Sequence, residues 1–380
     1  MSVKFYHIIL FSALIGLGCG SLRVSDEKKE ESVLASQAAF SKFALTKNAI
    51  SYTDLVPPLT LAWEEDYISL PSGGFTPVGD VLFNGSYNGY VSGIDRRDGD
   101  LLGKKNLGDA CAVPPSYYKG LLFQAFETGK FGLIAYDIKN GDILWEIRRN
   151  FSRSAPVIID DKVYFQTLDG RIFCYYYKNG EVLWQDSLAQ SIRTSPAFSD
   201  GSLISVTQQG EVFAFEFTSG SRLWKTDLKM PVFADPVISD NRLYVATHTG
   251  TIFIIDLPTG RIRKTFVDGK PFYLGPTVDN TQIFLARSNG EILALDKENL
   301  KLHWQFEGEG PPAGPLVATP SYLYVSTLGK KLYVLDKSLG QPVQEIDLSG
   351  RAQSGPLLFN ESLYLAVEDK QVVAYDQQKK

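Results

Sequence analysis

The sequence predicts an all-β protein, an eight-bladed β-propeller of four-stranded antiparallel blades that spans residues 57–380. Three observations support this fold: a repeat of about 40 residues, strand-like segments at the same place in each repeat, and a last repeat that ends one strand early. A proline marks each repeat, and successive prolines lie 38 to 41 residues apart. These prolines are Pro77, Pro115, Pro156, Pro196, Pro236, Pro276, Pro315 and Pro356.

The first half of each repeat contains a strand and a tight turn. About eight residues after each proline comes an apolar, aromatic-rich segment, such as residues 163–165 and 243–245, and this composition favours a strand over a helix. A glycine follows in most repeats, and glycine suits the positive φ of a hairpin turn. We expect these turn residues to be Gly89, Gly132, Gly170, Gly210, Gly250 and Gly290, with Lys330 and Lys370 in the last two repeats.

The second half of each repeat places an acidic residue before a second turn. A short carboxylate can accept backbone N–H bonds in the turn that follows it. The repeat puts each acid in a different blade, so we expect a turn role and not calcium binding or catalysis. The acids are Asp95, Asp137, Glu216, Asp256, Asp296, Asp336 and Asp376, and Tyr176 stands at this position in the remaining repeat.

Tryptophans follow the second turn and are expected to dock each blade against the next. They are Trp145, Trp184, Trp224 and Trp304, whereas Gly103, Lys264 and Gln344 stand at this position in other repeats. Trp63 precedes the first full repeat, and the last repeat stops where its fourth strand is due. We therefore expect the segment around Trp63 to complete the C-terminal blade, which closes the ring and removes an exposed sheet edge.

The N-terminal region has a different character. Residues 1–18 have the apolar core of an export signal, and Gly16-Leu17-Gly18-Cys19 resembles a lipobox, in which the cysteine is lipidated and becomes the mature N-terminus. An ordinary signal peptide with an incidental Cys19 is the alternative. Residues 19–56 are polar and charged at first and then mildly amphipathic, which indicates a tether between lipid and domain with one short helix.

Composition excludes several classes of function. Of the 380 residues, 38 are Lys or Arg and 43 are Asp or Glu, so the net charge of −5 provides no basic field for nucleic acid. Outside the leader, only Cys111, Cys174, His248 and His303 offer soft metal ligands, and they are far apart in sequence. We therefore expect no metal site and no catalytic residues.

The pattern Asp-x-x-x-Gly-x-x-x-Trp resembles the docking motif of the pyrroloquinoline-quinone-type (PQQ-like) repeat family. The resemblance covers residues 57–380 and implies one of two roles, a quinoprotein dehydrogenase or a non-catalytic lipoprotein of the BamB type. Quinoprotein enzymes carry an adjacent cysteine pair and a tryptophan beside the cofactor. This sequence has no Cys-Cys, and its tryptophans occupy the docking position, so we expect no cofactor. A PQQ-dependent oxidoreductase remains the alternative.

The BamB resemblance implies a lipid-anchored scaffold in the cell envelope, at the outer membrane and facing the periplasm, whose partners are envelope proteins such as the barrel-assembly machinery. Ser154-Ala155-Pro156 is the nearest local likeness to that family. A basic loop precedes it, and Arg148, Arg149 and Arg153 stand out there against an acidic background. We take these three as candidate partner-binding residues, because arginine is favoured at interface anchors. Three solvated arginines in a connecting loop are the alternative.

Overall fold

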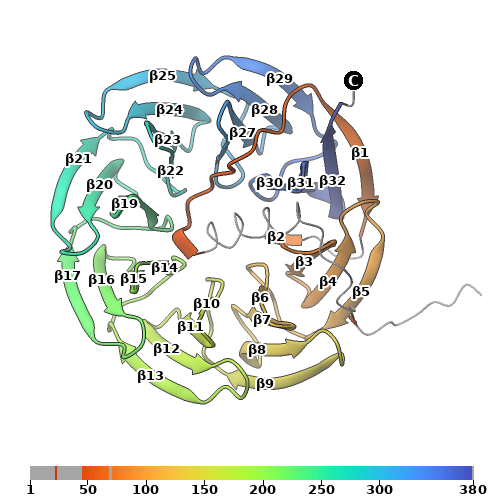
Figure 1. Ribbon diagram of the computed structural model, residues 1–380, viewed down its shortest axis with the longest axis vertical. Helices are drawn as coiled ribbons and strands as arrows, with labels where there is room; N and C mark the ends of the chain where they lie inside the picture. Colours follow the sequence, from red (N-terminus) through yellow and green to blue (C-terminus); the bar gives the residue numbers. More distant parts are fainter. Residues whose placement is uncertain (1–21, 24–44, 68–70, 379–380) are drawn as a thin grey trace, which may run out of the picture.

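The computed structural model describes residues 22–23, 45–67 and 71–378, so the expected leader and Cys19 lie outside the described residues. Eight four-stranded antiparallel sheets stand around a central axis, with the first strand of each blade innermost and the fourth at the rim (Figure 1). The predicted all-β, eight-bladed propeller is confirmed. Within the described residues, no helix has the length and apolar character needed to cross a membrane.

The first four blades follow one another along the chain. Blade 1 contains β2 (Pro71–Val78), β3 (Val81–Ser86), β4 (Tyr90–Asp95) and β5 (Leu101–Asn106), and blade 2 contains β6 (Ser116–Tyr118), β7 (Leu121–Ala125), β8 (Phe131–Asp137) and β9 (Asp142–Arg148). Blade 3 contains β10 (Val157–Ile159), β11 (Lys162–Gln166), β12 (Arg171–Tyr176) and β13 (Val182–Ser187), and blade 4 contains β14 (Ala197–Ser199), β15 (Ser202–Val206), β16 (Glu211–Glu216) and β17 (Arg222–Asp227).

The next three blades repeat this order. Blade 5 contains β18 (Val237–Ser239), β19 (Arg242–Ala246), β20 (Thr251–Asp256) and β21 (Ile262–Val267), and blade 6 contains β22 (Thr277–Val278), β23 (Gln282–Ala286), β24 (Glu291–Asp296) and β25 (Leu302–Glu307). Blade 7 contains β26 (Val317–Ala318), β27 (Tyr322–Ser326), β28 (Lys331–Asp336) and β29 (Pro342–Asp347).

Blade 8 is built from both ends of the chain. Its inner strands are β30 (Leu357–Phe359), β31 (Ser362–Val367) and β32 (Gln371–Gln377), with the short 3₁₀ turn η1 (Glu368–Lys370) between the last two, and its outer strand is β1 (Leu59–Asp66). Leu59 pairs with Gln377 and Trp63 pairs with Ala374. The segment around Trp63 therefore completes the C-terminal blade, as the early end of the last repeat predicts.

The core lies between neighbouring blades. The second and third strands, such as β19 and β20, are buried along almost their whole length, whereas the fourth strands alternate between exposed and half-buried residues. This difference arises because a middle strand has a blade on each side, but a rim strand turns one face to solvent.

Each tryptophan of the outer strands reaches the next blade. Trp184 pairs across its own sheet with the small side chain of Cys174, and its indole Nε1 donates to the Phe217 carbonyl of blade 4. A Cβ on Gly220, which has φ +73°, would lie 2.4 Å from the Trp184 ring, so only glycine lets the indole pack this closely. The same donation to the next blade recurs for Trp63 to Arg96, Trp145 to Tyr177, Trp224 to Leu257 and Trp304 to Lys337.

The acidic residues before the outer turns act locally. Asp296 accepts from the backbone N–H groups of Glu298 and Asn299, at 2.9 and 2.7 Å, and Asp336 does the same for Ser338 and Leu339. Hydrogen bonds from the Thr218 and Ser219 side chains and backbones lower the pKa of Glu216 to about 2. This confirms the turn role for these positions. Asp376 differs, because it accepts from the Ser362 hydroxyl.

The structure contradicts the expectation for Gly132. This residue lies inside β8, and the glycine of positive φ in the preceding turn is Gly129, at +102°. A Cβ on Gly132 would lie 1.9 Å from the Asn150 carbonyl oxygen, so Gly132 is required by the close approach of the loop that follows β9. The β7–β8 loop is longer than its counterparts, and this length displaces the turn glycine.

The indole contact predicts unequal sensitivity around the ring. Replacing Trp184 by alanine should lower the free energy of unfolding by about 3 to 5 kcal/mol, because it removes a large aromatic side chain from a seam between blades. Lys264→Ala is the matched control, since Lys264 occupies the same position in blade 5, opposite Ile254. Chemical denaturation of both variants measures the difference, and equal losses would contradict the docking role of the indole.

Candidate functional site

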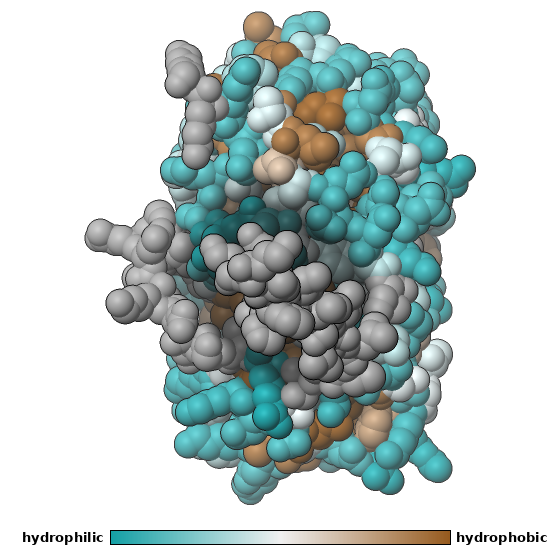
Figure 2. All heavy atoms as spheres, turned by 90° about the vertical axis from the view of Figure 1, so that its right-hand side faces the viewer, coloured by the Kyte–Doolittle hydropathy of each residue, from teal (hydrophilic) through white to brown (hydrophobic). Residues whose placement is uncertain are grey.

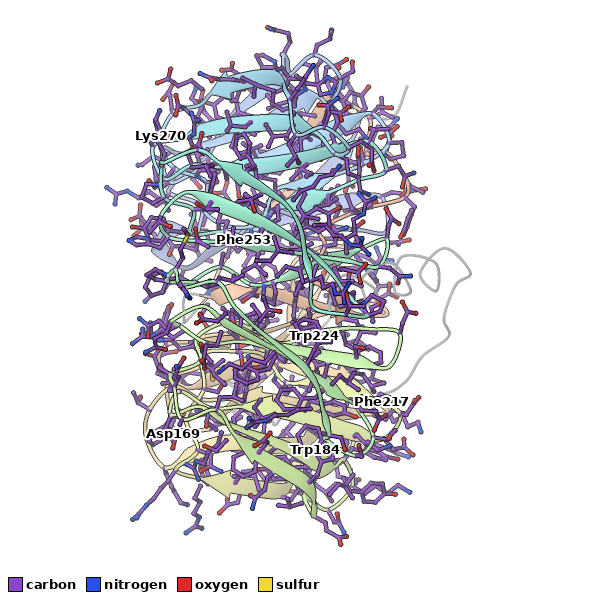
Figure 3. The ribbon with its side chains drawn as sticks, turned by 90° about the vertical axis from the view of Figure 1, so that its left-hand side faces the viewer. Asp169, Trp184, Phe217, Trp224, Phe253 and Lys270 are labelled. Atoms are coloured by element: carbon purple, nitrogen blue, oxygen red, sulfur yellow. The ribbon has the colours of Figure 1, made fainter. Side chains whose placement is uncertain are left out.

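The two faces of the disc carry different loops. Because neighbouring strands run in opposite directions, the turns between second and third strands and the loops between blades meet at one face, which we call the inter-blade face. The opposite face carries the other two sets of turns. In Figure 3, Asp169 and Lys270 lie at the inter-blade face, whereas Trp184 and Phe217 lie toward the opposite face.

The basic loop lies on the inter-blade face, between β9 and β10. Its backbone is held by neighbouring loops: Leu168 donates its N–H to the Phe151 carbonyl, and Ser152 donates its N–H to the Phe126 carbonyl, both at 2.8 Å. Arg171 donates to the Asn150 side chain at 3.0 Å. The loop is therefore a preformed feature, fixed against both neighbouring blades.

The three candidate arginines differ in their contacts. Arg148 forms a 2.6 Å ion pair with Glu146, and Arg153 is paired with Glu127. Among the described residues, Arg149 has no ion-pair partner, and its side chain is exposed. Because the first two charges are already compensated, Arg149 is the member of the loop whose charge remains available to a partner.

A second feature of the inter-blade face has no counterpart in the sequence motifs. The His248 ring lies between Phe233 and Tyr273, with ring centroids 5.1 and 4.9 Å away, and Tyr273 is 51% exposed. The Nδ1 atom of His248 is buried without a hydrogen-bond partner among the described residues. The three rings come from three different loops, so no sequence pattern brings them together. Aromatic side chains of this kind are enriched in protein interfaces.

Residues 45–55 cross the face opposite the inter-blade face, and we call them the strap. Ser51 donates its N–H to the Ala318 carbonyl, and Ala318 donates its N–H to the Ala49 carbonyl. Asn48 exchanges two hydrogen bonds with the Val278 backbone, at 2.7 and 2.9 Å. The strap thus pairs with the free edges of the short inner strands β22 and β26, and Figure 1 shows it running from the centre of the disc past β27 to β1.

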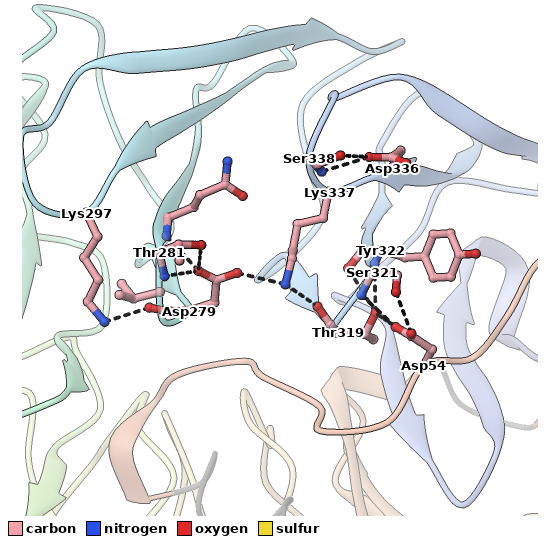
Figure 4. Close-up of polar contacts among 12 residues, drawn as sticks. Asp54, Asp279, Thr281, Lys297, Thr319, Ser321, Tyr322, Asp336, Lys337 and Ser338 are labelled. Atoms are coloured by element: carbon pink, nitrogen blue, oxygen red, sulfur yellow. Dashed lines mark hydrogen bonds and ion pairs between the residues drawn. The ribbon is translucent and has the colours of Figure 1, made fainter.

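The outer end of the strap is fixed by Asp54 and Leu55. Asp54 accepts from the Thr319 hydroxyl at 2.6 Å and from the Ser321 N–H and hydroxyl at 2.9 and 2.7 Å (Figure 4). Leu55 is buried, and its carbonyl accepts from the Tyr324 hydroxyl. Partial burial opposes ionisation of Asp54, but these hydrogen bonds outweigh it and lower the pKa of its carboxyl below the usual 3.8. The assignment of residues 45–55 to a tether is therefore wrong, since they belong to the folded domain.

The strap divides the mouth of the central channel into two hollows of about 800 and 790 Å³. Among the described residues, the charged ones that line the second hollow are Lys47, Asp54, Asp235 and Glu361, one cation against three carboxylates. Burial lowers the pKa of Lys47 and raises that of Asp235, and attraction between the two charges opposes both shifts. A polyanionic quinone would be repelled by this lining, and the five tryptophans lie at the rim, so the described residues do not fit the quinone cofactor.

Other chemical groups are dispersed. Among the described residues, no group of three or more His, Cys, Asp or Glu side chains is placed to hold a metal ion. Cys111 and Cys174 are buried free thiols, and burial raises the pKa of each to about 12. His303 is exposed and lies 3.4 Å from Asp296. These thiols are protonated at neutral pH, which makes them poor nucleophiles and poor metal ligands.

The rim on the side of β1 and β5 is visible in part, between residues that the structure does not describe. Figure 2 shows that side as mostly hydrophilic, with separate apolar areas. Scattered exposed apolar residues of this kind are normal for a soluble domain.

Comparison with known proteins gives one family and several structural likenesses. The family described as outer membrane protein assembly factor BamB matches residues 87–189, 169–263, 210–321 and 313–379. No curated protein sequence matches the chain significantly.

Three solved structures illustrate the likeness in fold. The structure of BamB from Moraxella catarrhalis is 19% identical, with a TM-score of 0.73 over 84% of this chain and 99% of that one. The quinohemoprotein alcohol dehydrogenase from Comamonas testosteroni is 14% identical, with a TM-score of 0.76 over 92% and 84%. The computationally designed Ika8 protein is 14% identical, with a TM-score of 0.71 over 87% and 99%. Identities this low show a shared fold and leave the function open.

The Asp54 contacts predict a pH-dependent contribution of the strap. A carboxyl whose pKa is lowered in the folded state adds stability above its unfolded pKa, near 3.8, and loses this contribution as the pH falls through the folded value. Asp54→Asn should therefore melt at a lower temperature than wild type at pH 7, and the difference should shrink below pH 3.8. Thermal melts at pH 7 and about pH 3 measure this, with exposed Asp66→Asn as the control. A constant difference at both pH values would contradict the role of the ionised carboxylate.

Proposed function

The chain belongs to the family described as outer membrane protein assembly factor BamB, and on that premise we propose that it is a non-catalytic, lipid-anchored scaffold that binds envelope proteins during outer-membrane protein assembly. The proposed location is the periplasmic side of the outer membrane, with Cys19 as the lipidated residue. The proposed binding surface is the inter-blade face around Arg149.

The single observation that carries the proposed binding surface is the uncompensated charge of Arg149 on a fixed loop. Its neighbours Arg148 and Arg153 are paired with Glu146 and Glu127. An exposed arginine on a preformed loop loses little conformational freedom of the backbone on binding, and it can pair with an acidic partner group. The aromatic cluster of Phe233, His248 and Tyr273 lies on the same face and supports a partner that spans several blades.

The lining of the central channel supports a non-catalytic role. In the part of the chain that the structure describes, one lysine and three carboxylates line the hollow beside the strap, and this balance disfavours an anionic cofactor. Purified protein mixed with pyrroloquinoline quinone and calcium should develop no absorption band of a bound quinone. A stoichiometric band, with turnover of an alcohol in the presence of an electron acceptor, would replace the proposal by a quinone-dependent oxidoreductase.

Charge reversal in the basic loop should abolish partner capture. Replacing Arg148, Arg149 and Arg153 together by glutamate should remove the barrel-assembly components from a pull-down of host envelope extract, because like charges then face each other. Arg149→Glu alone should produce most of this loss. Thermal stability should change little, since exposed charges contribute little to folding.

The control for charge reversal is Arg261→Glu, an arginine that is also exposed and follows β20 on the opposite face. It should leave capture unchanged. If wild type, the triple variant and Arg149→Glu recover the same proteins in equal amounts, the basic loop is not the contact.

The proposed anchor predicts a change in cell fractionation. Cys19→Ala should move the protein from the membrane pellet to the soluble fraction without changing its melting temperature, because acyl chains supply the membrane affinity. Fractionation after a high-salt wash, which removes electrostatically bound protein, measures this. A variant that still sediments with membranes would exclude lipidation as the means of attachment.

A further inference from the structure

Blade 1 lacks the side chain that ties every other blade to its neighbour. Gly103 stands at the tryptophan position of its outer strand, and it pairs with a second glycine, Gly93, on β4. The two other blades without a tryptophan still reach across. Lys264 donates its ammonium to the Glu298 carbonyl of blade 6, and Gln344 bonds both backbone groups of Leu59 in the closing strand. Blade 1 has no side chain at this position to do so.

The environment of the missing side chain can be read from the next seam. Trp145 of blade 2 lies against Phe123 of its own blade and Tyr175 of blade 3, with ring centroids 5.8 and 6.1 Å away. Phe123 pairs with Ala135, and Ala135 in turn pairs with Trp145 on its other side. Tyr175 directly follows Cys174, the residue that pairs with Trp184. We call the corresponding space between blades 1 and 2 the first-seam socket.

Equivalent residues line the first-seam socket. Phe83 pairs with Gly93 as Phe123 pairs with Ala135, and Tyr136 stands in blade 2 where Tyr175 stands in blade 3. A tryptophan carried by β5 would therefore contact Phe83 and Tyr136. Both residues are buried, although blade 1 contributes no side chain from its outer strand.

Leu22 fills this space from the N-terminal end of the chain. It is fully buried, at 0% exposure, in one cluster with Phe83 and Tyr136. A Cβ on Gly93 would lie 3.0 Å from Leu22 Cδ1, so glycine at this position makes room for the leucine. The Tyr136 hydroxyl donates to the Leu22 carbonyl at 3.0 Å. In Figure 1 the short red segment that contains Leu22 lies at the rim beside β5.

We propose that the first-seam socket is a binding site for the N-terminal segment, and that Leu22 replaces the missing docking tryptophan of blade 1. The two glycines leave the socket open, and an apolar side chain from outside the repeat closes it. The burial of a leucine and one hydrogen bond to its carbonyl hold the segment at one defined seam of the ring.

Docking of Leu22 also sets where the anchor lies, and this consequence rests on the proposed lipidation of Cys19. Cys19 lies three positions before Leu22, so a lipid on Cys19 would be held within about 11 Å of the first seam. The tryptophan contacts lie beside the turns of the face that the strap crosses, opposite the inter-blade face. At blades 1 and 2, the face that the strap crosses would then point toward the membrane. The inter-blade face would point away from the membrane and remain open to partners.

The test is a double-mutant cycle in the mature chain carrying Cys19→Ser, so that its result does not depend on lipidation. Leu22→Asp should lower the melting temperature by on the order of 5 °C, because a carboxylate cannot remain in the apolar socket. Gly103→Trp should fill the socket from β5, and in that background Leu22→Asp should cost almost nothing. Arg23→Ser is the control, because Arg23 is the exposed neighbour of Leu22.

A second measurement reports on the seam itself. Cys111 belongs to the same buried cluster as Leu22, and Cys174 lies in the seam between blades 3 and 4. Leu22→Asp, or the milder Leu22→Ala if the aspartate variant does not fold, should raise the labelling rate of Cys111 by a thiol reagent about tenfold or more and leave Cys174 unchanged. Docking would be disproved by equal melting temperatures of wild type and variant, by the same loss in the Gly103→Trp background, or by equal changes at both cysteines.

Discussion

The fold depends on one contact, made at seven of the eight seams, in which a side chain from the outer strand of a blade reaches a backbone carbonyl of the next blade. Blade 1 is the exception, because Gly103 stands at this position. Where the side chain is tryptophan, the indole also packs on a glycine in the next blade's outer turn, as Trp184 does on Gly220. A closed ring makes these seams interdependent, because a gap at any one of them exposes the buried faces of two blades. The contact therefore constrains residues in both blades at once, a large ring in one and no side chain in the other.

This dependence explains which features the sequence could predict. The blades and the acidic turns recur, and repetition turns a weak local signal into a strong one. The number of blades and the closure by Trp63 follow from counting the repeats and from the early end of the last one. The strap and Leu22 occur once. Leu55 and Leu22 belong to no repeat, and nothing in their spacing indicates that β26 and the first seam have room for them. The prediction for Gly132 was wrong because glycine is required both in tight turns and where two backbones approach closely, and a sequence does not distinguish these two cases.

The candidate site was predictable to a smaller extent. The basic loop could be predicted because three arginines lie close together in an acidic protein. That only one of them has an uncompensated charge could not be predicted, because the folded chain pairs the other two with Glu146 and Glu127. The aromatic cluster of the inter-blade face was invisible, since Phe233, His248 and Tyr273 come from three loops. Side chains on separate loops are brought together only by the closed ring, which is why a repeat predicts a scaffold better than it predicts a surface.

The departures from the repeat also make the two faces of the disc different. The strap, Asp54 and the docked Leu22 hold the N-terminal chain on one side, where inner strand edges and an open seam would otherwise lie exposed. Each of these additions satisfies a backbone group or fills a space that the repeat leaves unfilled. Among the described residues nothing covers the inter-blade face in this way, and its loops around β9 and β10 are fixed by hydrogen bonds to one another. A preformed surface of this kind meets a partner without first releasing part of the described fold, and this property supports the proposed scaffold role.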